Sequence, residues 1–131
     1  MENRDKNLIS LRPTLNLSTA AGKIEQFQND TLRPILKFQN ELILQICQNQ
    51  FVKRKGLFYQ LSELEQLKYV EQQILRDLHF KNLLFGIIIG HFTSEDWQFY
   101  NKNEQDLKKR ITSMLVKRIQ SQVSLLTSDF N

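Results

Sequence analysis

Residues 83–92, near the middle of the chain, have the sequence LLFGIIIGHF, and TSEDW follows directly at residues 93–97. The first ten of these residues contain no Asp, Glu, Lys or Arg, and their two glycines, Gly86 and Gly90, lie four positions apart. A helix without a polar side is typical of an element that its neighbours enclose all round. The sequence therefore predicts a compact helical fold organised around one buried helix.

The composition of the chain favours the same fold class. Of its 131 residues, 40% are hydrophobic, and only four are Gly and two are Pro. Average usage is about 7% Gly and about 5% Pro, so this chain is poor in turn residues, and long helices joined by short connections are favoured. We predict an all-α compact helical bundle of four main helices plus one or two short helices, which forms a single domain over residues 23–131.

Residues 1–22 are predicted to form an extended N-terminal arm in front of this domain. Apolar residues recur at every second position around Arg12-Pro13, and a proline disfavours helix in the residue before it. Two alternatives are open for the arm: a strand-like tail laid over the bundle, or an arm exchanged with a second subunit. A short helix is predicted to follow over residues 23–29.

The first long helix is predicted over residues 31–53. Asp30 is a suitable N-cap, and Pro34 falls in the first turn, where its missing N–H is least harmful. The sequence KRKG at residues 53–56 places cations and then a glycine at the end of this helix, which is a typical stop signal.

The later helices also have recognisable starts. The sequence SELE at residues 62–65 is a capping box. Whether its helix continues to residue 92 or breaks near Asp77 is open. Thr93 and Asp96 repeat the capping pattern at the start of a brief helix, and the last long helix is predicted over residues 104–126.

The positive charge of the chain is concentrated on this last predicted helix. The formal net charge is +4, and residues 101–123 account for the whole excess. Lys109, Arg110 and Lys117 form a possible face for an anionic partner. No aromatic residue is interleaved with these cations, so nucleic-acid binding is the least favoured of the functions considered.

The residues that could carry chemistry are few. Cys47 is the only cysteine, so the chain has no intrachain disulfide, and a reducing, cytoplasmic location is predicted. Residues 83–92 are about half as long as the roughly 20 residues that span a bilayer, so no membrane association is expected. Neither His79 nor His91 has a glutamate three residues before it, so the Glu-x-x-His motif of di-iron helical bundles is absent. Cys47 lies on the apolar side of its predicted helix, where burial raises the pKa of a thiol and makes it inert. We therefore predict no metal site, no cofactor and no catalytic residue.

The glycine pair indicates close helix packing. Each glycine inside a helix costs up to about 1 kcal/mol relative to alanine. A sequence that has Gly86 and Gly90 one turn apart is predicted to gain close backbone contact with a neighbouring helix. That neighbour is either another helix of the same chain or the same helix in a second copy. A further alternative is that Gly90 alone forms the C-cap of the helix, with His91 beyond it.

Four stretches resemble a known group of proteins: FQNDTLRP at residues 27–34, KRK at residues 53–55, IIGHFT at residues 88–93 and RIQSQ at residues 118–122. They resemble small uncharacterised helical proteins of bacteria that sometimes carry the label "glyoxalase". The resemblance implies a helical fold of unknown role. It does not imply isomerase activity, because this chain has neither the strands nor the histidine and glutamate ligands of true glyoxalase I proteins.

These observations favour a small interaction or self-associating protein without catalytic activity, with a homo-oligomer or a protein partner. One alternative is a metal-free enzyme or small-molecule binder that uses a pocket between helices. The other is nucleic-acid binding through the basic face of the last helix.

Overall fold

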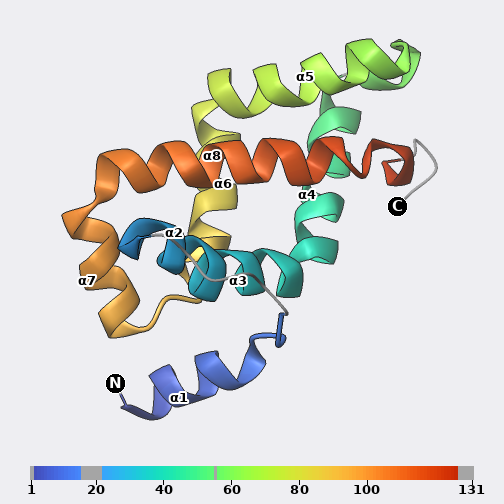
Figure 1. Ribbon diagram of the computed structural model, residues 1–131. Helices are drawn as coiled ribbons and strands as arrows, with labels where there is room; N and C mark the ends of the chain where they lie inside the picture. The colour runs from blue at the N-terminus through green and yellow to red at the C-terminus, as the bar shows by residue number, and fades with distance from the viewer. Residues whose placement is uncertain (1, 16–21, 55, 127–131) are drawn as a thin grey trace. The chain divides into compact units, whose positions relative to one another are not determined.

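The computed structural model describes residues 2–15, 22–54 and 56–126. The described residues form helices and contain no strand (Figure 1), so the predicted all-α class is confirmed. Within the same residues, no helix combines the length and the apolar composition that crossing a membrane requires.

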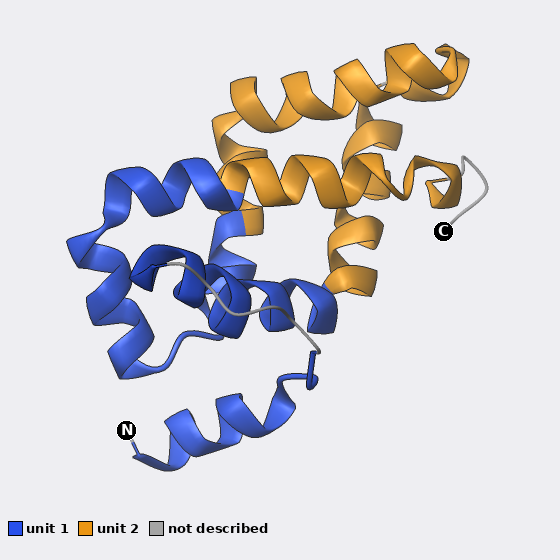
Figure 2. Ribbon diagram, in the orientation of Figure 1, with its two compact units in different colours: residues 1–39, 85–111 blue, residues 40–84, 112–131 orange. Residues whose placement is uncertain are grey.

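The chain divides into two compact units, each built from two separate stretches of sequence (Figure 2). Unit 1 contains residues 1–39 and 85–111, and unit 2 contains residues 40–84 and 112–131. The chain therefore passes between the units three times, twice within a continuous helix. The single domain expected over residues 23–131 stays a prediction.

Unit 1 packs around a group of aromatic side chains. Its elements are α1 (Glu2–Leu11), α2 (Lys23–Phe27), the π-helical turn η1 (Gln28–Leu32), α3 (Arg33–Phe38), the end of α6 (Leu78–Ile89), α7 (Ser94–Lys102) and the first half of α8 (Glu104–Gln120). The ring of Phe27 lies 5.6 Å from that of Phe92 and 4.9 Å from that of Phe99, and Phe92 also contacts Tyr100 at 5.7 Å. Each such ring pair contributes about 0.5–1.5 kcal/mol beyond the burial of its surface.

Unit 2 has an aromatic core of its own, centred on Phe51. Its elements are α4 (Asn40–Lys53), the 3-10 helix η2 (Leu57–Gln60), α5 (Glu63–Arg76), the start of α6, the second half of α8 and η3 (Val123–Leu125). The ring of Phe51 contacts Phe58 at 4.8 Å, Tyr69 at 5.2 Å and Phe80 at 6.2 Å.

The predicted extended conformation of the N-terminal arm is wrong for Glu2–Leu11, which form helix α1. Acidic residues in its first turn favour a helix start. The restriction imposed by Pro13 reaches only Arg12, the residue before it, so the helix ends there instead of failing to form. Residues 16–21 of the arm lie outside the described residues.

The predicted helix over residues 31–53 is also wrong as a single element. The helix begins earlier, at Lys23, and a break at Gln39 (φ −92°, ψ 6°) separates α3 from α4. Gln39 and Asn40 are amide residues with distant partners, His91 in unit 1 and Gln122 in unit 2 respectively. The predicted end is confirmed, because α4 stops at Lys53 and Gly56 has a left-handed φ of 66°.

Residues 62–92 form two helices, which settles the alternative that the sequence leaves open. The capping box of Ser62 and Glu65 begins α5, as predicted. Asp77 ends α5 and caps α6, because its Oδ1 accepts a hydrogen bond from the Phe80 amide at 3.1 Å. That hydrogen bond is the largest cause of the lowered pKa of Asp77, to which Arg54 also contributes.

The last helix begins at Glu104 as predicted but ends at Gln120, six residues before the predicted end. Residues Val123–Leu125 then form the separate 3-10 helix η3. The hydrophobic pattern continues into η3, since Val123 is buried, and for this reason the pattern alone does not mark the end of α8.

The interpretation of residues 83–92 as an element enclosed all round is wrong. Leu84, Phe85 and Ile88 are buried, but Leu83 is 52% exposed, and both Gly86 and Gly90 are exposed. A Cβ atom added at Gly86 would meet no heavy atom within 4 Å, so no close intramolecular crossing occurs there among the described residues. The exposed positions recur with helical spacing, so α6 has an exposed side that carries glycines instead of charged residues.

Asp77→Ala is expected to lower the free energy of unfolding by about 1–2 kcal/mol, because it removes the N-cap of α6. It also removes the acceptor of hydrogen bonds from Gln50 and Arg54. Asp77→Asn keeps a capping oxygen and is expected to lower the free energy of unfolding by a smaller amount. Urea denaturation measures both variants, and equal losses would contradict the capping role.

Gly86→Ala is expected to raise the free energy of unfolding by about 0.5–1 kcal/mol in dilute solution, since alanine restricts the unfolded chain and has open space here. Gly90→Ala is the matched control. Its Cβ would lie 3.1 Å from the Gly86 carbonyl oxygen, so no comparable gain is expected. Chemical denaturation measures both, and a destabilised Gly86→Ala would show that the space is filled.

Candidate functional site

The turn between α6 and α7 gathers polar contacts from several parts of unit 1. As predicted, a capping box begins α7: Asp96 N donates to Thr93 Oγ1 at 3.1 Å, and Thr93 N donates to Asp96 Oδ2 at 2.9 Å. This reciprocal pair satisfies two amide groups that a helix start leaves without intrahelical partners.

Asp96 has further partners from outside its own helix. Arg12 Nη2 donates to Asp96 Oδ2 at 2.6 Å, and Thr31 Oγ1 donates to Asp96 Oδ1 at 3.4 Å. The Arg12 and Asp96 side chains are only 13% and 14% exposed. This ion pair is therefore shielded from water and is screened less by salt than a surface pair.

Charged residues from α1 and the segment after it bind the backbone of the same turn. Arg4 donates to the Phe92 carbonyl at 2.8 Å and to the Gly90 carbonyl at 3.2 Å, and Arg12 donates to the His91 carbonyl at 3.0 Å. Asp5 accepts a hydrogen bond from the Ser94 amide at 3.2 Å. No residue of α1 is buried, and the polar contacts of Arg4 and Asp5 tie α1 to this turn.

His91 lies at the centre of this turn as a neutral side chain. Gln39 Nε2 lies 2.8 Å from His91 Nε2, which fits an unprotonated ring nitrogen that accepts a hydrogen bond from the amide. The Phe38 ring packs against the imidazole with a centroid distance of 5.3 Å. Burial lowers the pKa of His91 below its usual value of 6.5, and the positive charges of Arg12 and Arg4 lower it further.

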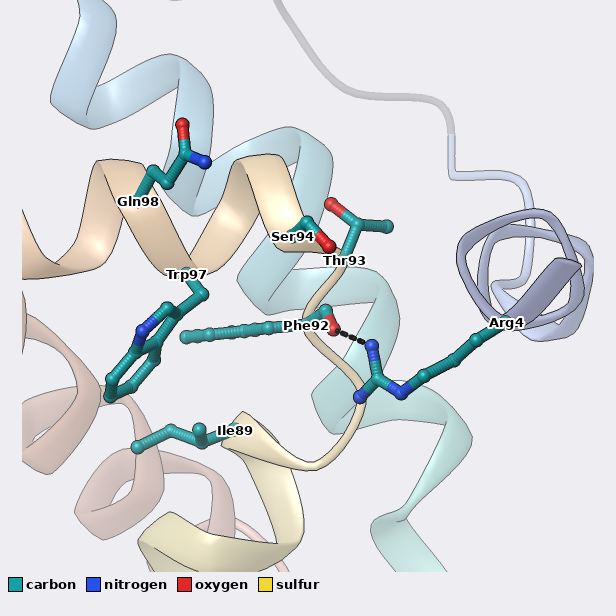
Figure 3. Close-up of a pocket in the computed structure, with 7 residues that line it drawn as sticks. All are labelled: Arg4, Ile89, Phe92, Thr93, Ser94, Trp97 and Gln98. Atoms are coloured by element: carbon teal, nitrogen blue, oxygen red, sulfur yellow. Dashed lines mark hydrogen bonds between the residues drawn. The ribbon is translucent and has the colours of Figure 1, made fainter. Parts of the chain in front are cut away.

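A pocket of about 440 Å³ opens beside the turn, within unit 1 (Figure 3). Ile89, Phe92 and Trp97 form its apolar wall, and Figure 3 shows Trp97 and Arg4 on opposite sides of Phe92. The volume falls within the range of about 300–1,000 Å³ that small-molecule pockets show. His91 is not part of its lining, so the pocket does not bring a histidine to a bound molecule.

The predicted cationic face lies on α8 but is partly engaged. Arg110 donates to Asp106 and to Gln28, at 3.0 Å in both cases. Lys109 and Lys117 are exposed, and they belong to different units. The binding of an anionic partner to this face stays a prediction.

Cys47 and His79 are the other residues considered for chemistry. Cys47 is buried, and burial raises its pKa to about 12, so the thiol stays protonated at neutral pH. His79 is exposed. In the part of the chain that the structure describes, no group of three or more His, Cys, Asp or Glu side chains lies close enough to share a metal ion.

Sequence reasoning finds the cap of this turn but not its distant partners. Arg4 and Arg12 fall in the predicted arm, and no local pattern distinguishes an arginine that binds a remote helix end from a solvated one. Trp97 can be singled out from the sequence, because it is the only tryptophan of the chain and lies on a short predicted helix that has both apolar and polar residues.

Comparison with protein-family models, with curated protein sequences and with solved structures finds no match for this chain. The resemblance to the bacterial group labelled "glyoxalase" therefore stays a prediction.

Stability is expected to fall as the pH is lowered from about 7 to about 5. The unfolded chain protonates His91 near pH 6.5, whereas the folded chain holds its pKa lower. This contribution is therefore complete above pH 6.5 and is lost as the pH falls through the folded-state pKa. Urea titrations at each pH measure it. His91→Gln should flatten the dependence, and a slope that survives in this variant would refute the assignment.

Proposed function

We propose that this chain is a non-catalytic interaction module that associates with a second copy of itself. The contact surface is the exposed side of α6 that carries Gly86, together with Gly90 directly after the end of the helix, hereafter the glycine face. The observation that supports the proposal is the open space around Gly86.

Gly86 has no conformational reason to be glycine. Gly56 is the only glycine with positive φ among the described residues, and alanine at position 86 would meet no neighbour within 4 Å. Gly90 differs, because a Cβ there would lie 3.1 Å from the Gly86 carbonyl oxygen. The cost of a helical glycine at position 86 is therefore not offset within the folded chain, and close approach of an external helix is the compensating gain.

A glycine face suits a symmetric partner. Helices normally pack with axes about 8–10 Å apart, and small side chains at the contact permit the shorter distances. In a two-fold dimer the same surface occurs on both subunits, so each glycine pair would face its own copy. Ile87, half-buried next to Gly86, supplies apolar surface to the same contact.

The non-catalytic part of the proposal is supported by the state of the reactive side chains. Cys47 is held as a buried thiol, and His91 is engaged by Gln39.

The proposal retains the predicted bundle of four main helices, for which the longest helices, α4, α5, α6 and α8, are the candidates. It also retains the cytoplasmic location predicted from the lone cysteine.

Sedimentation velocity over a range of about 1–200 µM tests the self-association, because a modest interface has a Kd in the micromolar range. The unaltered chain is expected to sediment as a dimer at the upper end. Gly86→Leu is expected to remain folded and to sediment as a monomer, since its side chain has room in the monomer but blocks helix approach.

Gln72→Leu on the exposed side of α5 is the matched control, because it adds the same apolar side chain away from the glycine face. It is expected to dimerise like the unaltered chain. A monomer at all concentrations for the unaltered chain, or a dimer that Gly86→Leu leaves intact, would end the proposal.

A further inference from the structure

We infer that the pocket beside the α6–α7 turn binds a small organic anion with a flat aromatic body. The inference stands apart from self-association, because none of the pocket residues belongs to the glycine pair. Its lining combines an apolar wall with a fixed positive charge.

The apolar wall suits a flat ring. Trp97 is 45% exposed although it is the largest side chain of the pocket, and its indole stacks on Tyr100 with a centroid distance of 5.7 Å and an interplanar angle of 24°. This stacking holds the indole in place before a ligand arrives, which reduces the entropy that binding would cost. With the half-buried Ile89, it offers the kind of surface against which an aromatic ring packs well, whereas Phe92 is 2% exposed and supports this surface from below.

The charge at the rim selects an anion. The Arg4 guanidinium donates to two backbone carbonyls, which are neutral acceptors. Asp5 Oδ1, which also accepts the Ser94 amide, forms an ion pair with Arg4 Nη1 at 3.5 Å and offsets part of the Arg4 charge. A guanidinium has five N–H donors, so further donors remain for a carboxylate that approaches to hydrogen-bond distance.

Ser94 is a second polar feature of the lining. Its hydroxyl is buried and has no hydrogen-bond partner among the residues that the structure describes. A buried hydroxyl without a partner costs about 1–3 kcal/mol. This hydroxyl has no surface open to the pocket, so recognition of the anion rests on the Arg4 guanidinium.

The single tryptophan of the chain makes this inference directly measurable. The indole N–H resonance of Trp97 in the ¹⁵N-labelled full chain is followed while 2-naphthoate is added. We expect a saturable shift of that resonance. The neutral isostere 2-naphthamide is expected to bind at least about fivefold more weakly, because it lacks the charge-assisted hydrogen bond.

Two variants locate the charge. Arg4→Gln is expected to raise the Kd of 2-naphthoate at least about fivefold and to leave the Kd of 2-naphthamide nearly unchanged. Lys6→Gln removes an equal charge from an exposed position of α1 outside the pocket lining. It is expected to change neither of the two Kd values. The Ser94 amide resonance reports in the same spectra whether α1 stays attached through Asp5.

The comparison of the two ligands on the unaltered chain requires no variant, so the inference stays testable even if Arg4→Gln releases α1. Equal affinities for acid and amide would overturn it. An indole resonance that does not shift at 2-naphthoate concentrations up to about 10 mM would also overturn the inference, because this concentration is ten times a Kd of about 1 mM.

Discussion

Unit 1 depends on the carboxylate of Asp96, whose two oxygens join three separate segments of the chain. One oxygen closes the capping box with Thr93 and accepts Arg12, and the other accepts Thr31. Water competes little for these bonds, because the Arg12 and Asp96 side chains are nearly buried. The start of α7, the segment after α1 and the turn η1 are therefore positioned by one residue, and Trp97, the next residue, is positioned with them.

Complementary charges explain why α1 and the segment after it attach at this turn. Arg4 and Arg12 donate to the carbonyls of Phe92 and His91, which lie in the turn after the end of α6 at Ile89. Asp5 accepts the Ser94 amide at the start of α7, where the first amides of a helix carry partial positive charge. The charged side chains thus meet backbone groups of opposite partial charge, and no residue of α1 is buried.

The features that sequence reasoning predicts are those determined by neighbouring residues. The capping boxes at Ser62 and Thr93 involve residues three positions apart, and both were predictable for that reason. Gln39, at the break between α3 and α4, contacts His91, which is 52 residues away in sequence. A local pattern does not contain such a distant partner, and the hydrophobic periodicity continues across the break. Likewise, an uncharged run predicts a buried helix because glycine counts as apolar, although glycine can equally lie on an exposed side.

Several departures from what helix stability favours lie close together in sequence. An exposed glycine within α6, a second at its end, a buried hydroxyl without a partner at Ser94 and a half-exposed Trp97 all fall within residues 86–97. Local rules are generally obeyed where a sequence serves only its fold, and they are broken where another demand competes. Other parts of the chain also have departures, such as the buried Tyr59 hydroxyl without a partner and the exposed Leu78. Within residues 86–97 the departures coincide with a pocket and with the Arg4 guanidinium, and this coincidence is the physical reason for proposing that binding occurs at the end of α6 and the start of α7.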